Sequence, residues 1–286
     1  MLRVDEFESV FRSALKEIYQ HQEITINSAL LVSDLEVSDA EKLLMRVKSF
    51  CRPIDSSQSI NWTLVGRNDF SSAEDLLAVI DRSTFELIVT YRNLYSESWR
   101  HPYSLGEHLD VMLQRTSMPV LVIPHPLAGY ARDQSLHTCS SVMVVSDLMV
   151  NDHHLVRYGL AFIEEDGHLY LSHMEDRQYF DRVIDAISKI PTIDTADAEQ
   201  RLAKQLLKEP ADYIQSVIRV LDEMSRSIEV TPIVEFGHQL KDYLKHIEEK
   251  HIDLLIINTK DGDQMAMHGL AYPLAVEVRQ IPLLML

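Results

Sequence analysis

Short apolar runs alternate with longer amphipathic stretches along most of the chain. The runs at 29–32, 85–90 and 119–124 predict buried strands, because each is short and is bounded by polar residues. The stretches 39–50 and 107–118 place their apolar residues at helical spacing. Strands that alternate with helices in this way are typical of an α/β fold with a mainly parallel sheet.

The pattern occurs twice. Residues 28–39 (SALLVSDLEVSD) and 141–152 (SVMVVSDLMVND) are identical at seven of twelve positions, and Ser-Asp ends the apolar run in both. Four further landmarks follow in the same order in each half: Gly66 and Gly237, the strands 85–90 and 252–259, Gly106 and Gly269, and the Pro-led strands 119–124 and 282–286. Five landmarks in one order predict an internal duplication.

The duplication predicts two domains, 1–132 and 133–286. The second half is longer, with an additional strand at 168–176 and a helical insert at 177–228. Because proline lacks a backbone donor, Pro191 and Pro210 should divide this insert into three helices, which we expect near 178–189, 195–208 and 211–227. Before the first repeat, residues 4–18 have the spacing of an amphipathic helix.

Charge and composition narrow the classes of partner. The chain carries 27 basic and 44 acidic residues, a formal charge of -17, which disfavours both nucleic acid and anionic membrane surfaces. Its apolar runs are all shorter than the roughly 20 residues that a membrane span needs. Cys51 and Cys139 form no CxxC pair, and we expect a cytoplasmic protein with reduced thiols.

The order of these landmarks resembles the universal stress protein family, over nearly the whole chain and twice. The resemblance implies two doubly wound, mainly parallel sheets with a ligand crevice at the carboxyl ends of the strands. It also implies that the last strands, 119–124 and 282–286, pair with each other as an intramolecular pseudo-dimer; a further homodimer stays open. Such pairing would cover apolar edges that otherwise invite aggregation.

Members of that family that bind ATP carry small residues after the fourth strand and a Gly-Ser or Gly-Thr pair at the start of the last helix. This chain departs from the pattern in both halves. Tyr91, Leu94 and Glu107 stand at those positions in the first half, which we therefore expect not to bind ATP. In the second half Leu270 follows Gly269, so the usual phosphate contacts are incomplete there and ATP remains a possible cofactor.

Polar residues gather at the predicted strand ends of the second half, and they form our candidate site for a small polar ligand. These residues are Asp147, His173, Glu175, Gly237, His238, Asn258, Thr259, Lys260, Asp261, His268 and Gly269. Imidazole and carboxylate groups could also hold a divalent metal, although no tight metal-binding spacing occurs. Each residue taken singly could instead be structural, as a hydrogen-bonded histidine or a helix-capping aspartate.

Three functions are compatible with these residues. The first is a non-enzymatic stress-response or signalling module whose second half binds a small polar ligand. The second is an ATP-binding protein with at most slow hydrolysis, which would use Gly237, Asn258, Lys260 and Gly269. The third is an interaction scaffold that presents the insert 177–228 to a protein partner. Catalytic motifs such as GxSxG and GxxxxGK are absent from the sequence, and Ser146, His173 and Asp147 make only a chance triad.

Overall fold

The computed structural model describes residues 18–100, 104–132, 135–147, 149–150, 152–259 and 269–286. The amphipathic helix expected at residues 4–18 lies almost wholly outside the described residues. The same holds for three residues of the predicted site, Lys260, Asp261 and His268.

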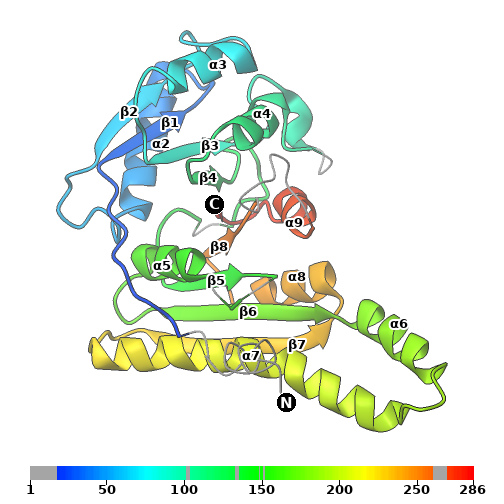
Figure 1. The fold of residues 1–286 in the computed structure, drawn as a ribbon. Coiled ribbons are helices and arrows are strands. Elements are labelled where there is room, and N and C mark those ends of the chain that lie inside the picture. Colours follow the sequence, from blue (N-terminus) through cyan, green and yellow to red (C-terminus); the bar gives the residue numbers. More distant parts are fainter. Residues whose placement is uncertain (1–17, 101–103, 133–134, 148, 151, 260–268) are drawn as a thin grey trace, which may run out of the picture.

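The described strands form one nine-stranded sheet, with helices flanking it (Figure 1). In spatial order the strands are β2-β1-β3-β4-β9-β8-β5-β6-β7. Their bounds are β1 Ser28–Val32, β2 Asn61–Val65, β3 Leu87–Tyr91, β4 Val120–Ile123, β5 Ser141–Val145, β6 His168–Asp176, β7 Glu229–Gly237, β8 Leu254–Ile257 and β9 Leu283–Met285. The helices are α2 Val37–Phe50, α3 Ala73–Ile80, η1 Glu97–Arg100, α4 Glu107–Arg115, α5 His153–Phe162, α6 Arg177–Ser188, α7 Thr195–Glu223, α8 Gln239–Glu249 and α9 Ala271–Glu277.

The two halves repeat one strand arrangement. β1 lies between β2 and β3, and β5 lies between β6 and β8, always in parallel register. β4 then follows β3, and β9 follows β8. The predicted α/β class and the internal duplication are therefore confirmed.

One predicted landmark is wrong. We matched Gly66, after β2, with Gly237, after β7. However, β2 is the neighbour of β1 and so corresponds to β6, whereas β7 pairs with β6 at the edge of the sheet. The strand without a counterpart in the first half is thus β7. The match between Gly66 and Gly237 misled us, because in chain order β6, like β2, is the second strand of its half.

The last strands of the two halves pair with each other, as predicted. β4 and β9 are antiparallel, with Val120 opposite Met285 and Leu121 opposite Leu284, and they are the one antiparallel pair among the described strands. This pairing corrects the expectation of two separate sheets, because it joins them into one. The division into domains 1–132 and 133–286 remains a prediction.

The helical insert differs from its prediction at Pro210. We expected a break there, but α7 runs without interruption from Thr195 to Glu223. Pro210 is buried, as are Tyr213, Ile214 and Val217 one and two turns later. Packing of this apolar face against β6 and β7 therefore outweighs the hydrogen bond that proline removes.

The core consists of the strands and the inner faces of the helices. β3, β4, β8 and β9 are buried along their whole length, as expected for central strands covered on both faces. The buried Arg92 links the halves, since its Nε and Nη2 donate to the carbonyl of Ala275 at 2.9 and 2.7 Å. Among the described helices, none is both long and apolar enough to cross a membrane.

Candidate functional site

The carboxyl ends of β5, β6 and β8 bring several predicted site residues together. Asp147 follows β5 and lies beside Gly269, where a Cβ atom would be 3.2 Å from Asp147 Oδ2. Gly269 has a φ of 56°, in the left-handed region that favours glycine. A side chain at position 269 would therefore crowd the Asp147 carboxylate.

Asn258, directly after β8, belongs to a second group at the same edge. Its amide Nδ2 donates to both carboxylate oxygens of Asp152, at 3.0 and 3.1 Å. The Ser146 hydroxyl donates to the same carboxylate at 2.5 Å. Our sequence analysis did not assign Asp152 to the site. Its place as the last residue of the repeated segment 141–152 was the signal that could have identified it.

His173 is buried near the end of β6, and both of its ring nitrogens have partners. Nδ1 lies 3.1 Å from the Ser146 carbonyl oxygen, and Nε2 lies 3.1 Å from Glu175 Oε1. Since a carbonyl can only accept, Nδ1 carries a proton in this arrangement. Tyr243 lies on α8, and its pKa is raised. The main cause is burial of the phenol, and the second is the negative charge of Asp147. His173 and Glu175 therefore contact each other at the end of β6, and β6 is the neighbour of β5, which Asp147 follows.

The remaining predicted residues that the structure describes lie at or just after strand ends, and their contacts are structural. A Cβ atom on Gly237 would be 2.6 Å from Met174 Sδ, so this glycine permits close packing between β7 and β6. The His238 backbone N–H donates to Asp242 Oδ2 at 2.7 Å at the start of α8. Thr259 donates from its N–H and its hydroxyl to the Leu286 carbonyl, at 2.8 and 2.7 Å.

These contacts do not assemble a catalytic triad. The Ser146 hydroxyl is directed to Asp152, whereas the His173 ring contacts the Ser146 carbonyl and Glu175. A nucleophile needs its hydroxyl on the base, which this geometry does not provide. Within the described part of the chain, no three His, Cys, Asp or Glu residues converge as metal ligands would.

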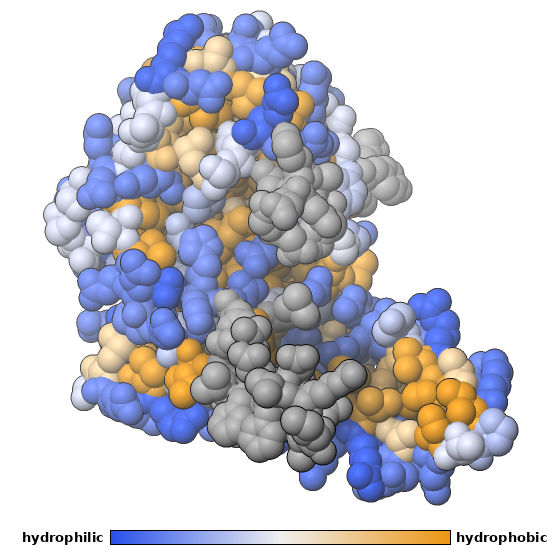
Figure 2. Space-filling view, viewed as in Figure 1, coloured by the Kyte–Doolittle hydropathy of each residue, from blue (hydrophilic) through white to orange (hydrophobic). Residues whose placement is uncertain are grey.

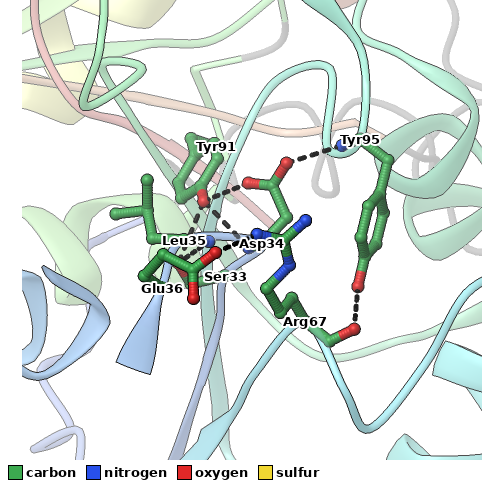
Figure 3. A network of polar contacts seen from close by, with 7 residues as sticks. All are labelled: Ser33, Asp34, Leu35, Glu36, Arg67, Tyr91 and Tyr95. Atoms are coloured by element: carbon green, nitrogen blue, oxygen red, sulfur yellow. Dashed lines mark hydrogen bonds and ion pairs between the residues drawn. The ribbon is translucent and has the colours of Figure 1, made fainter. Parts of the chain in front are cut away.

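The first half fills the equivalent edge with two tyrosines (Figure 3). The buried Tyr91 hydroxyl donates to Asp34 Oδ1 at 2.5 Å and lies 2.9 Å from Ser33 Oγ. It also accepts the Asp34 N–H at 3.0 Å. The Tyr95 N–H donates to the other Asp34 oxygen at 2.8 Å, and its hydroxyl reaches the Arg67 carbonyl at 2.6 Å. Both oxygens of Asp34 are therefore already bonded within the protein.

The strand register makes Tyr91 the counterpart of Asn258. Ala29 pairs with Leu87, and Val142, which occupies the same place in the repeat, pairs with Leu254. Tyr91 lies four residues after Leu87, and Asn258 lies four residues after Leu254. A large phenol thus stands in the first half at the place that the smaller amide has in the second.

Comparisons with known proteins bear on the fold. No family model matches the sequence, and no curated protein sequence matches it. A functionally unknown protein from Pseudomonas aeruginosa PAO1 matches in structure, with 13% identity, 91% of this chain and 92% of that chain covered, and a TM-score of 0.51. A candidate universal stress protein from Pseudomonas aeruginosa UCBPP-PA14 has 12% identity, coverage of 91% and 93%, and a TM-score of 0.51. The chain has the universal-stress-protein fold.

The universal-stress-protein fold indicates where a ligand would bind, and the two halves differ at that place. In such doubly wound sheets, ligands bind at the carboxyl edge of the strands. At that edge, Tyr91 and Tyr95 saturate Asp34 in the first half. In the second half Asp147 lies beside a glycine, and Asn258 lies at the position of Tyr91. The second half is therefore the candidate site.

Proposed function

We propose that this protein is a non-enzymatic stress-response or signalling module whose second half binds a small polar ligand. The observation that carries the proposal is the exchange of Tyr91 for Asn258 at one register position. The phenol bonds to the Ser-Asp pair of its own half, whereas the Asn258 amide is turned to Asp152. The proposed pocket lies between Asp147, Asn258 and Gly269.

The chemistry of these residues favours a ligand rich in hydroxyl or amino groups. The Asp147 carboxylate accepts hydrogen bonds, and Asn258 offers both a donor and an acceptor. Gly269 allows such a ligand to approach the backbone closely. A sugar or the ribose of a nucleoside has the required donors.

The proposed pocket offers a phosphate group fewer hydroxyl donors than the pattern of ATP-binding members does. In the pattern of ATP-binding members a hydroxyl follows the last glycine, but Leu270 stands there and is buried. The Thr259 hydroxyl is directed to the Leu286 carbonyl. We therefore rank ATP binding with slow hydrolysis second, supported by the juxtaposition of Gly269 and Asp147.

Calorimetric titration with adenosine and with ATP separates these two functions. If the ribose and base carry recognition, we expect both probes to bind with affinities within about threefold of each other, and no phosphate release. ATP binding more than about tenfold tighter, roughly 1.4 kcal/mol, would favour the second function. Absence of adenosine binding, together with no co-purifying small molecule by native mass spectrometry, would contradict the proposal.

The two halves supply a matched pair of variants. Asp147→Asn should weaken adenosine binding at least about tenfold, because a carboxylate acceptor bonded to a ligand hydroxyl is lost. Asp34→Asn changes the equivalent residue of the closed half and should leave adenosine affinity within about twofold. Equal losses in both variants would indicate a general effect on folding and would count against the assignment to the second half.

An interaction scaffold is the third function, and one surface favours it. Large apolar side chains are exposed on α6, on the loop that follows it and on the first half of α7, where orange atoms gather in Figure 2. They are Tyr179, Ile190, Ile193, Leu202 and Leu206. If this surface binds a protein partner, Leu202→Glu with Leu206→Glu should abolish the interaction and Lys204→Glu should not. Unchanged binding in the double variant would exclude the surface.

A further inference from the structure

A cavity of about 900 Å³ lies between the two halves, away from the candidate site. Its walls come from segments that precede strands: residues 21–24 before β1, 52–56 before β2, 160–165 before β6 and Arg226 before β7. In Figure 1 the connection that contains the first of these segments runs from beside α7 to β1. The residues of the candidate site instead follow their strands, so the two sites are distinct.

Three arginines, Arg52, Arg157 and Arg226, line this cavity. Within the described residues, none of the three forms an ion pair with a carboxylate. This is unexpected in a chain with 44 acidic and 27 basic residues, where acidic partners are in excess. The cavity therefore holds guanidinium groups whose positive charge has no bonded anion.

Two of these guanidinium groups are held in place by backbone carbonyls. Arg157 donates from Nε and Nη2 to the Gln20 carbonyl, at 3.1 and 2.9 Å. Arg226 donates from Nη2 to the Leu160 carbonyl at 3.3 Å. A carbonyl fixes the direction of the group without neutralising it. The remaining N–H donors keep the planar fork that suits phosphate and carboxylate oxygens.

His21 adds a further donor or acceptor at the same place. Its Nε2 is buried and has no hydrogen-bond partner in the described part of the chain. Burial, followed by the charge of Arg226, lowers the pKa of this imidazole; the carboxylate of Glu23 opposes the shift, and Arg157 adds to it. Both arginines thus act electrostatically on His21.

We infer that this cavity binds a small molecule that carries a phosphate group, held by Arg157 and Arg226 with help from Arg52. A phosphate offers several oxygens to the guanidinium forks. Three carboxylates, Glu23, Glu164 and Glu165, also line the cavity; their oxygens can accept hydrogen bonds from hydroxyl groups of the same ligand, while the phosphate is held at the arginines. The volume of about 900 Å³ is that of pockets for metabolites up to nucleotide size.

The test uses glycerol 3-phosphate as the probe and glycerol as its uncharged control, with binding measured by calorimetry and by ³¹P line broadening. The full chain should bind glycerol 3-phosphate and not glycerol. Arg157→Gln with Arg226→Gln should weaken binding at least about tenfold, and the glutamine at position 157 can still donate to the Gln20 carbonyl from the place of Arg157 Nε. Arg52→Gln should weaken binding about threefold. Within the described residues Arg52 makes no side-chain hydrogen bond, so this change should not disturb the fold.

Two controls make the outcome specific. Arg67→Gln with Arg201→Gln removes two exposed arginines that already have carboxylate partners, and it should leave binding unchanged. Asp147→Asn should also leave it unchanged, which separates this cavity from the candidate site. No binding by the wild-type chain up to about 10 mM probe would overturn the inference. Equal affinity for citrate, or unchanged binding in Arg52→Gln and the double arginine variant, would overturn it as well.

Discussion

Gly106 occupies a position where the family resemblance predicts a phosphate-contacting glycine, but its surroundings give it another role. Its φ is 89° and its ψ is 149°, a conformation essentially confined to glycine. A Cβ atom there would lie 2.7 Å from Asn93 Cα. Gly106 thus lets the loop after β3 pack closely against the start of α4.

Replacing Gly106 with alanine should therefore destabilise the protein. We expect Gly106→Ala to lower the free energy of unfolding by about 2 kcal/mol or more, from backbone strain and from overlap with backbone atoms that cannot move away. Gly129→Ala is the matched control, because no atom lies within 4 Å of the Cβ it would add. Urea denaturation of both variants measures the difference, and equal stabilities would contradict this explanation.

His125 predicts a pH dependence of stability. Burial lowers the pKa of its imidazole to about 4, and the Leu127 N–H donates to Nδ1, which must be unprotonated to accept it. The unfolded chain protonates near the ordinary value of about 6.5. Because the folded state has the lower pKa, stability is complete above pH 6.5 and is lost as the pH falls towards 4, by at most about 1.4 kcal/mol per pH unit.

Denaturation measured between about pH 7 and pH 5.5 tests this dependence. In the variant His125→Gln the decline should be flatter, because glutamine does not titrate. An identical slope in the variant and the wild-type chain would mean that another group carries the effect.

At the residue scale, the sequence placed several residues at strand ends, and their role as a site remains a prediction. Asp147, Asn258 and Gly269 were all assigned to the candidate site because strand ends of a parallel sheet meet at one edge. Asp152 was missed because its partners, Asn258 and Ser146, depend on the fold and not on local spacing. The structural role of Gly106 was not predicted, because its φ value and its closeness to Asn93 depend on the fold.

At the element scale, the periodic segments were predicted well and the insert less so. The buried strands and the helix beginning near residue 37 follow from apolar runs and helical spacing. Pro210 did not end a helix, because long-range packing of its neighbours on β6 and β7 overrides the local preference. The counterpart of β2 was misassigned because Gly66 and Gly237 were matched as residues, whereas the strand that follows β5 and pairs with it is β6.

The distribution of buried residues along α7 predicts unequal local stability. All of its buried residues lie between Pro210 and Leu221, whereas Thr195–Lys208 has none. Backbone hydrogen bonds with little packing over them open more readily. In hydrogen–deuterium exchange, amides of residues 199–208 should therefore exchange at least about tenfold faster than those of 212–221. Equal protection along the helix would instead indicate that a partner or another copy covers its first half.

At the scale of the whole molecule, the join between the halves rests on short strands. β4 and β9 pair over three residue positions, and the Arg92 side chain crosses from one half to the α9 end of the other. The family resemblance implied this pairing of the two last strands. It could not predict Arg92, whose partners Ala275 and Val278 are backbone carbonyls.

Removal of the last strand should therefore convert a well-behaved protein into an aggregating one. A chain that ends at Ile281 loses β9, which leaves β4 and β8 with unpaired edges in the middle of the sheet. Both strands are wholly buried and aliphatic, VLVI and LLII, and carry no charge to deter pairing with other chains. Light scattering coupled to size exclusion should show large aggregates for this truncation. A control chain with three polar residues added after Leu286 should elute as the wild type does, and a soluble, monodisperse truncation would refute the role assigned to β9.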